Sequence, residues 1–273
     1  MQEYEQLACN PKQATKFINR FCWPNYQRFC PKCKSRKVAK LSADKRKCLR
    51  CNFTFTNFTH RYLGIIRVEA TTWLRIIKLF EMEVKPDEMA YQLKLSYNTL
   101  RKAITAMRLA ILANSLDGPY LIKHFSLNEL LKQKKIQITP HPIFGLIEEK
   151  GQVFIDFLPD MDINNFIHLK LNFLLPSKKI GQVIYTAPVK QYLSLMLYDQ
   201  NITKTYKLNH KAQYIPLDKN KNFWPFAKQR LSSFRTTNSL NFLLYCKELE
   251  FRYNFKRKDF FIRLLKYLTT FYC

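Results

Sequence analysis

Between residues 67 and 114, apolar side chains recur with the spacing of amphipathic helices. A helix over 70–82 places four of them on one face, and Pro86 begins a second helix that ends at Leu93. After a turn at Lys94 and Leu95, Ser96 is positioned to cap a third helix. A short helix, a tight turn and a Ser-capped helix predict a helix-turn-helix over 67–114. The inward positions are Trp73, Ile76, Ile77 and Phe80 in the first helix and Leu100, Ile104, Met107 and Ile111 in the third.

From residue 136 onward the pattern changes to short apolar runs that alternate with helical segments. Two of these runs flank the turn sequence Glu148-Glu149-Lys150-Gly151, which predicts a β-hairpin. The order strand, strand, strand, helix, strand, helix predicts an α/β domain over residues 136–273. Three antiparallel strands followed by a crossover helix and a parallel fourth strand would place the strand at 181–186 beside the strand at 136–138. The predicted strands are 136–138, 143–147, 152–158, 181–186 and 205–208, and the predicted helices are 161–174, 188–197 and the segment from residue 223.

Residues 1–28 form an N-terminal leader in this partition, with a short helix expected around Lys12 to Arg20. Residues 115–135 form a linker that opens with Asp117-Gly118-Pro119. The chain has no run of about 18 apolar residues, which a transmembrane helix requires, and the polar, acidic segment 1–10 is unlike a signal peptide. We therefore expect no membrane partner and a location in the cytoplasm or nucleoid, or in the nucleus of a eukaryote.

Two Cys-x-x-Cys pairs lie in the basic segment 29–60, formed by Cys30 with Cys33 and by Cys48 with Cys51, and fourteen residues separate them. Two knuckles at this distance can bring four thiolates to one tetrahedral metal ion. The other four cysteines are scattered along the chain, which argues against a disulfide framework. The sequence therefore predicts a zinc ribbon with one structural Zn²⁺, because four cysteine ligands leave no open coordination position for catalysis.

The chain of 273 residues carries 46 Lys and Arg against 20 Asp and Glu, a formal net charge of +26. Such an excess favours a polyanionic partner, and we expect double-stranded DNA. A solvated basic surface is the alternative explanation for the charge, and a helical hairpin without DNA contacts is the alternative for 67–114. The candidate DNA-binding residues lie in the ribbon and at the start of the third helix: Arg36, Lys37, Arg46, Lys47, Ser96, Tyr97, Asn98, Thr99, Arg101 and Lys102.

The order of these parts resembles the ISXO-type insertion-sequence transposases of bacteria and their eukaryotic Merlin relatives. The resemblance implies an RNase H-like catalytic domain in which two Asp and a third acidic or polar residue hold two Mg²⁺ ions. The predicted fold class is then α+β multidomain: a zinc ribbon and a helix-turn-helix, followed by an RNase H-like α/β domain of the DDE transposase type in a degenerate form. The residues that carry the resemblance are the Phe29-Cys30-Pro31-x-Cys33 motif, the second knuckle, Trp73, Leu93-x-x-Ser96, Phe144–Ile147, Val183–Thr186, Asn209-His210, Phe223-Trp224, Lys228 and Glu250–Asn254.

All three positions at which the resemblance implies a catalytic residue are substituted. They are occupied by Thr139, Ala187 and Lys221. Magnesium needs hard oxygen ligands, and these three side chains cannot neutralise two divalent ions. We therefore expect no Mg²⁺ and no catalytic residue in this chain. An active enzyme with relocated ligands stays open as an alternative because the same region holds Asp156, Asp160, Asp162, Asp199 and Asp218.

The leading hypothesis from the sequence is a transposase-derived DNA-binding protein that has lost catalysis. It would act as a domesticated, site-specific DNA binder or as an accessory or regulatory subunit. The expected partners are double-stranded DNA, including sites like terminal inverted repeats, and either a second copy of the chain or another protein such as an active transposase. Two alternatives stay open: an active transposase or nuclease with relocated metal-binding carboxylates, and an RNA-binding or structural subunit of a larger nucleoprotein assembly.

Overall fold

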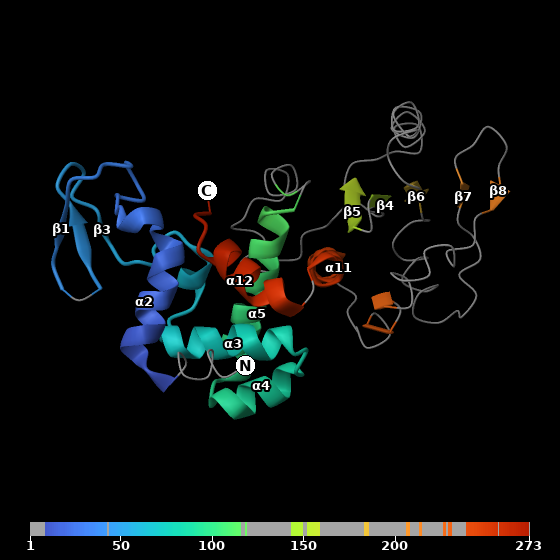
Figure 1. The fold of residues 1–273 in the computed structure, drawn as a ribbon, viewed down its shortest axis with the longest axis horizontal. Helices are drawn as coiled ribbons and strands as arrows, with labels where there is room; N and C mark the ends of the chain where they lie inside the picture. Colours follow the sequence, from blue (N-terminus) through green and yellow to red (C-terminus); the bar gives the residue numbers. More distant parts are fainter. Residues whose placement is uncertain are drawn as a thin grey trace. The chain divides into compact units, whose positions relative to one another are not determined.

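The computed structural model divides the chain into two compact units (Figure 1). The terminal unit combines residues 1–114 with residues 257–273, and the central unit comprises residues 115–256. The description below is confined to residues 9–42, 44–115, 118, 143–149, 152–158, 183–185, 206–207, 213–214, 226–227, 229–230, 239–255 and 257–272.

The terminal unit begins with helix α2 (Pro11–Cys22), which confirms the helix predicted around Lys12 to Arg20. Asn10 caps this helix, because its side-chain oxygen accepts hydrogen bonds from the backbone N–H groups of the second and third residues at 3.0 and 3.2 Å. One face of α2 is buried through Ala14, Ile18 and Cys22. The segment expected as a leader therefore contributes to the core of this unit.

Three short strands follow, β1 (Val38–Lys40), β2 (Arg46–Cys48) and β3 (Thr54–Phe55). They form an antiparallel sheet with β2 in the centre. Side chains alternate between the two faces of a strand. Accordingly Arg46 and Cys48 are buried, whereas Lys47 between them is half-buried.

The helices predicted within 67–114 are present as α3 (Ala70–Glu81), α4 (Pro86–Leu93) and α5 (Tyr97–Ala113), preceded by the 3₁₀ helix η2 (Tyr62–Ile65). All eight predicted inward side chains are buried. The indole Nε1–H of Trp73 donates to the Leu63 carbonyl at 3.1 Å, which fixes α3 against η2. Helix α4 contacts both α3 and α5.

Helix α12 (Arg257–Leu268) belongs to the terminal unit, although the sequence partition placed residues 136–273 together in one C-terminal domain. It packs against α2, α3 and α5, and in Figure 1 the red α12 lies beside the green α5. The rings of Phe260 and Phe80 are 6.2 Å apart. The physical reason is hydrophobic burial, since α12 inserts Phe260, Phe261, Leu264, Leu265 and Leu268 into this core.

A buried arginine connects the end of α2 and the residues after α12 to the ribbon. Arg61 is 3% exposed, and its guanidinium donates hydrogen bonds to the backbone carbonyls of Asn57, Cys22 and Thr269. The same group lies 3.8 Å from the ring centre of Phe271 and 4.7 Å from that of Trp23. Burial lowers the pKa of Arg61, but carbonyl oxygens and aromatic faces compensate for the lost hydration of the cation.

The central unit contains a five-stranded sheet in the order β5-β4-β6-β7-β8. The predicted hairpin is confirmed: β4 (Ile143–Glu149) and β5 (Gln152–Leu158) pair antiparallel, from Ile143 opposite Leu158 to Glu149 opposite Gln152. The other strands are β6 (Val183–Tyr185), β7 (Tyr206–Lys207) and β8 (Gln213–Tyr214).

One strand has a different neighbour from the one expected. The sequence placed the strand at 181–186 beside the strand at 136–138, whereas β6 pairs antiparallel with β4, with Leu146 opposite Ile184. Residues 136–138 lie outside the described part of the chain, as do the helices predicted at 161–174 and 188–197 and the positions Thr139, Ala187 and Lys221.

Helix α11 (Ser239–Asn254) packs against β5 and buries charged side chains as well as apolar ones. Lys247 pairs with Glu250 at 3.0 Å, and Arg252 pairs with Glu248 at 2.7 Å. All four side chains are less than 10% exposed. Charges are tolerated at such depth only when they are paired, so two of the charged residues in the motif Glu250–Asn254 have a structural role. Within the described residues, no helix is both long and apolar enough to span a membrane.

Candidate metal centre and nucleic-acid interface

The two cysteine knuckles of the ribbon have the same backbone geometry. The N–H of Lys34 donates to the Cys30 carbonyl at 2.9 Å, and the N–H of Asn52 donates to the Cys48 carbonyl at 3.0 Å. Both donor residues adopt the left-handed conformation, with φ of 59° and 56° respectively. This conformation reverses the chain directly after the second cysteine of each pair, so that both sulfurs of a knuckle face the same point.

The four sulfurs meet the geometric requirement of a tetrahedral zinc site. All four Sγ atoms lie within 4.8 Å of one another, with 3.6 Å between Cys30 and Cys51 and 3.5 Å between Cys33 and Cys48. A Zn–S distance of about 2.3 Å implies tetrahedral S–S separations of about 3.8 Å. The cluster is therefore positioned to bind one zinc ion, as the sequence predicted. Within the described residues, it is the one group of His, Cys, Asp or Glu side chains arranged to hold a metal.

The pKa values of two of these thiols are shifted in opposite directions. The pKa of Cys48 is lowered to about 6, chiefly by a backbone hydrogen bond from Cys51 and also by one from Arg50, whose N–H lies 3.4 Å from Sγ. The N–H of Phe53 lowers the pKa of Cys51, but burial and the neighbouring thiols outweigh it and raise this pKa to about 12. Four thiolates this close repel one another, so complete ionisation of the cluster requires a bound cation.

Beside the first knuckle lies a group of aromatic rings that includes Phe271, near the C-terminal end of the chain. The ring of Phe29, beside the first knuckle, lies 5.4 Å from Trp23 and 5.5 Å from Phe271. The ammonium group of Lys34 lies 4.9 Å from the Phe271 ring centre. Sequence reasoning did not predict this group, because residue 271 is more than 200 positions away from the knuckle along the chain.

The four candidate DNA-binding residues of the ribbon differ in their exposure to solvent. Arg36 and Lys37 are exposed and Lys47 is half-buried. Arg46, in contrast, is 6% exposed and donates to the side-chain oxygen of Asn57 at 3.0 Å. The same oxygen accepts the indole N–H of Trp23 at 3.1 Å. Arg46 therefore connects the sheet to α2, and we do not retain it as a DNA contact.

The candidates at the start of α5 fall into two groups. The hydroxyl of Ser96 accepts a hydrogen bond from the Thr99 N–H at 3.2 Å and lies 2.8 Å from the Thr99 hydroxyl. This pair caps the helix, as predicted for Ser96. The remaining four residues present their side chains at the surface: Tyr97, Asn98, Arg101 and Lys102.

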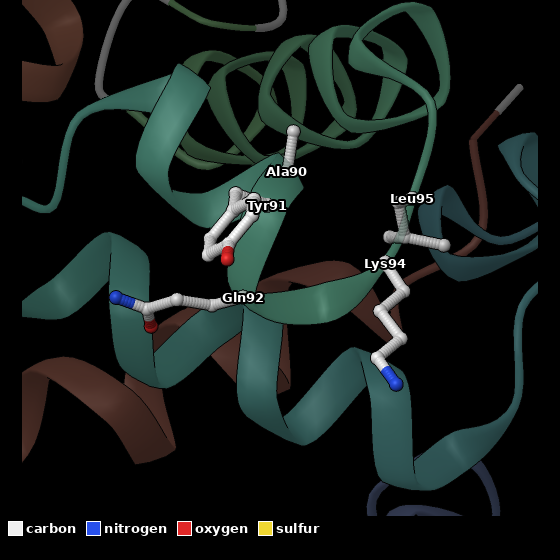
Figure 2. A pocket seen from close by; sticks show the side chains of 5 residues that line it. All are labelled: Ala90, Tyr91, Gln92, Lys94 and Leu95. Atoms are coloured by element: carbon white, nitrogen blue, oxygen red, sulfur yellow. The ribbon is translucent and has the colours of Figure 1, made fainter.

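A shallow hollow lies where α4 ends and the chain turns toward α5. It is lined by Ala90, Tyr91, Gln92, Lys94 and Leu95 (Figure 2). Tyr91 is 86% exposed, and Lys94 ends the helix in the left-handed conformation with φ of 51°. The sequence analysis did not single out Tyr91. The sequence feature that could have identified it is an aromatic residue on the outward face of a short amphipathic helix.

The geometry defines a four-cysteine zinc ribbon joined to a three-helix unit. Residues 10–54 match the family model of the transposase zinc-ribbon domain of the IS1595 family, which relates the chain to insertion-sequence transposases. The match begins at the cap of α2 and so includes this helix, which packs against α3 and α12. No curated protein and no solved structure shows a significant match to the chain.

Proposed function

We propose that the chain is a transposase-derived, zinc-dependent protein that binds double-stranded DNA through its terminal unit and does not catalyse DNA cleavage or strand transfer. The observation that carries the proposal is a four-cysteine cluster within a transposase zinc-ribbon segment. Charge supports the choice of partner, since residues 29–60 contain nine Lys and Arg against one Asp and no Glu.

The second DNA-binding element in this proposal is the α4–α5 pair, acting as a helix-turn-helix of the ISXO-type transposases. Its support is the three-residue connection from Lys94 to Ser96 and the exposed side chains at the start of α5. Tyr97, Asn98 and Arg101 would face the base edges of a major groove. Lys94 and Lys102 would contact the phosphates on either side.

The central unit would be an RNase H-like domain without its metal-binding carboxylates. The support for the fold is the antiparallel hairpin β4–β5, and the support for the missing carboxylates is the substitutions Thr139, Ala187 and Lys221. The antiparallel pairing of β6 with β4 does not follow the strand order of that fold. A DNA-bound protein of this kind could repress transcription, mark transposon-like ends, or act as the inactive subunit beside an active transposase or a second copy of itself.

Site-specific binding is tested by pulling down DNA from cells that express the tagged chain and sequencing it. The proposal predicts a short recurrent motif, including sites that resemble terminal inverted repeats. RNA recovered in preference to duplex DNA, in a parallel pull-down from the same cells, would contradict it and would favour a subunit of a ribonucleoprotein assembly.

The loss of catalysis is tested with a supercoiled plasmid and oligonucleotides that carry the recovered motif, in Mg²⁺ or Mn²⁺. The proposal predicts neither cleavage nor strand transfer. Cleavage that survives substitution of Lys221 but is abolished by Asp156→Ala would contradict it and would establish an enzyme with relocated ligands.

A further inference from the structure

The antiparallel ladder of β1 and β2 continues beyond the residues assigned to the strands. The assigned pairs run from Val38 opposite Cys48 to Lys40 opposite Arg46. At one end the N–H of Leu49 donates to the Lys37 carbonyl at 2.9 Å, and at the other end the N–H of Leu41 donates to the Lys45 carbonyl at 3.0 Å. The hairpin is therefore a two-stranded ribbon with five cross-strand pairs from 37–49 to 41–45.

Alternation along this ladder assigns each side chain to one of two faces. The inner face carries Cys48 and Arg46 and, on β3, Phe55, all of them buried. The opposite face, which we call the open face, is exposed or half-buried throughout. Leu41 and Leu49 on this face are 56% and 61% exposed. The open face consists of Lys37, Ala39 and Leu41 in and beside β1, Lys45, Lys47 and Leu49 in and beside β2, and Thr54 on β3.

The chemistry of the open face is unusual for a solvated sheet. Its central row has the small side chains of Ala39 and Thr54 on either side of Lys47. Small neighbours let a flat partner approach the sheet closely, and Lys47 can extend from the middle of the row. Two leucines and two further lysines surround this row. An exposed surface that combines cations with leucine side chains fits a partner with negative charge and apolar groups at the same spacing.

We propose that the β1–β2 hairpin enters the major groove of duplex DNA with its open face toward the base pairs. The major groove of B-DNA admits a two-stranded β-ribbon. Lys47 reaches the base edges at the centre, Leu41 and Leu49 contact thymine methyl groups or sugars, and Lys37 and Lys45 meet the phosphates at the rims. The inference rests on the proposed DNA binding and adds a second reading element to α5. The cluster of cysteines then acts as the rigid support behind the hairpin.

Two observations favour duplex DNA over an acidic protein as the partner. This segment matches a transposase zinc-ribbon domain, and Asp44 is the only acidic residue in the sequence 29–60. An acidic protein is recognised by separate ion pairs, and its binding does not require a surface that carries cations with almost no carboxylates between them. The thymine methyl groups of the major groove also give the two exposed leucines an apolar partner.

The experiment compares two lysines that lie on neighbouring strands but on opposite faces. Lys47→Gln removes the central cation of the open face, and Lys40→Gln removes an exposed cation opposite Arg46 on the other face. Binding of the full chain to duplex DNA with the recovered motif is measured by fluorescence anisotropy over a range of salt concentrations. Zinc content is measured for each variant, and both are expected to keep one ion per chain.

The inference predicts that Lys47→Gln lowers affinity about tenfold and relaxes the discrimination between base pairs at the position it contacts, whereas Lys37→Gln, at a phosphate, reduces the salt slope by about one. Lys40→Gln should change affinity less than about threefold by the same reasoning. Methylation of guanine N7 modifies the major groove. At some positions it should weaken binding of the unsubstituted chain but leave binding of Lys47→Gln unchanged. Leu49→Ser should weaken binding to thymine-containing DNA more than to the same duplex with uracil.

The outcomes separate the inference from the proposed function. If the unsubstituted chain does not bind duplex DNA, both fail. If it binds and Lys47→Gln and Lys40→Gln lose affinity equally, or if only Lys40→Gln loses affinity, the open face does not read DNA while DNA binding by the terminal unit stands. Interference confined to the minor groove would also overturn the placement of the hairpin.

Discussion

Arg61 shows how a single residue holds together segments that are distant in sequence. Its guanidinium binds carbonyls from the end of α2, from the ribbon and from the residue after α12, and within the described part of the chain none of its hydrogen-bond partners is a carboxylate. A cation bound by three carbonyls also positions two aromatic rings, Trp23 and Phe271. One planar group with several donors in a fixed geometry therefore connects these three segments.

Arg61→Met should destabilise the terminal unit by about 3 kcal/mol or more, because it leaves three buried carbonyls without their donor. Arg61→Lys keeps the charge but cannot match the planar donor geometry, so a similar loss is expected. Chemical denaturation followed by tryptophan fluorescence measures the change. Arg67→Lys, at an exposed position, is the matched control and should have little effect. Equal stability of Arg61→Lys and the unsubstituted chain would contradict this account.

Cys48→Ala should abolish stoichiometric zinc binding, because three thiolates are left and the ribbon has no other ligand among its described neighbours. Zinc supplies about 10 kcal/mol or more to the folding of such a unit. The ribbon should therefore unfold in this variant. Metal analysis and far-UV circular dichroism provide the measurements, and Cys9→Ala, at an exposed cysteine, is the control that should keep one zinc per chain. Unchanged zinc content in Cys48→Ala would refute the assignment.

At the scale of elements, local signals were sufficient for the ribbon and for the three helices. The spacing of the cysteine pairs predicted the metal cluster, and the helical period predicted α3, α4 and α5 with their buried positions. The burial of Arg46 follows from the alternation of side chains along a strand. Arg46 and Cys48 are two residues apart on β2, so both side chains face inward. The expectation for Arg46 considered its charge alone.

The turn between α4 and α5 contains a residue whose type does not suit its backbone. Lys94 has φ of 51° and ψ of 39°, and this conformation costs about 1 kcal/mol in a residue other than glycine. Lys94→Gly should therefore stabilise the terminal unit by up to about 1 kcal/mol, which thermal denaturation measures. Gln92→Gly, inside the last turn of α4, should destabilise it by a similar amount. If Lys94→Gly lowers stability, the strain at this turn has been misjudged.

At the scale of the whole molecule, the terminal unit is assembled from both ends of the chain. In the sequence, the residues of the central unit lie between α5 and α12. Sequence reasoning could not predict this arrangement. Helix α12 has the same local pattern whether it packs on the central sheet or on α3 and α5, and its destination depends on contacts between residues more than 140 positions apart, such as Phe80 with Phe260. The same limit applies to the contact of Phe271 with Phe29 beside the first knuckle.

A fragment that ends at residue 114 should not fold stably, because removal of α12 exposes the apolar faces of α3 and α5. Residues 1–114 joined to 257–273 by a flexible linker of about 20 residues should fold cooperatively and bind DNA. Circular dichroism melting of the two proteins side by side gives the comparison. Two equally cooperative transitions would show that α12 is dispensable for this unit.

The most direct test of the account is the salt dependence of duplex DNA binding by the full, zinc-loaded chain, measured beside Cys48→Ala. If the terminal unit is a zinc-dependent DNA-binding unit, the logarithm of the association constant should fall steeply and linearly with the logarithm of salt concentration, with a slope that corresponds to about five or more phosphate contacts. Cys48→Ala should bind at least about tenfold more weakly, a loss of about 1.4 kcal/mol. Binding that is insensitive to salt, or equal in the zinc-loaded chain and in Cys48→Ala, would contradict the account.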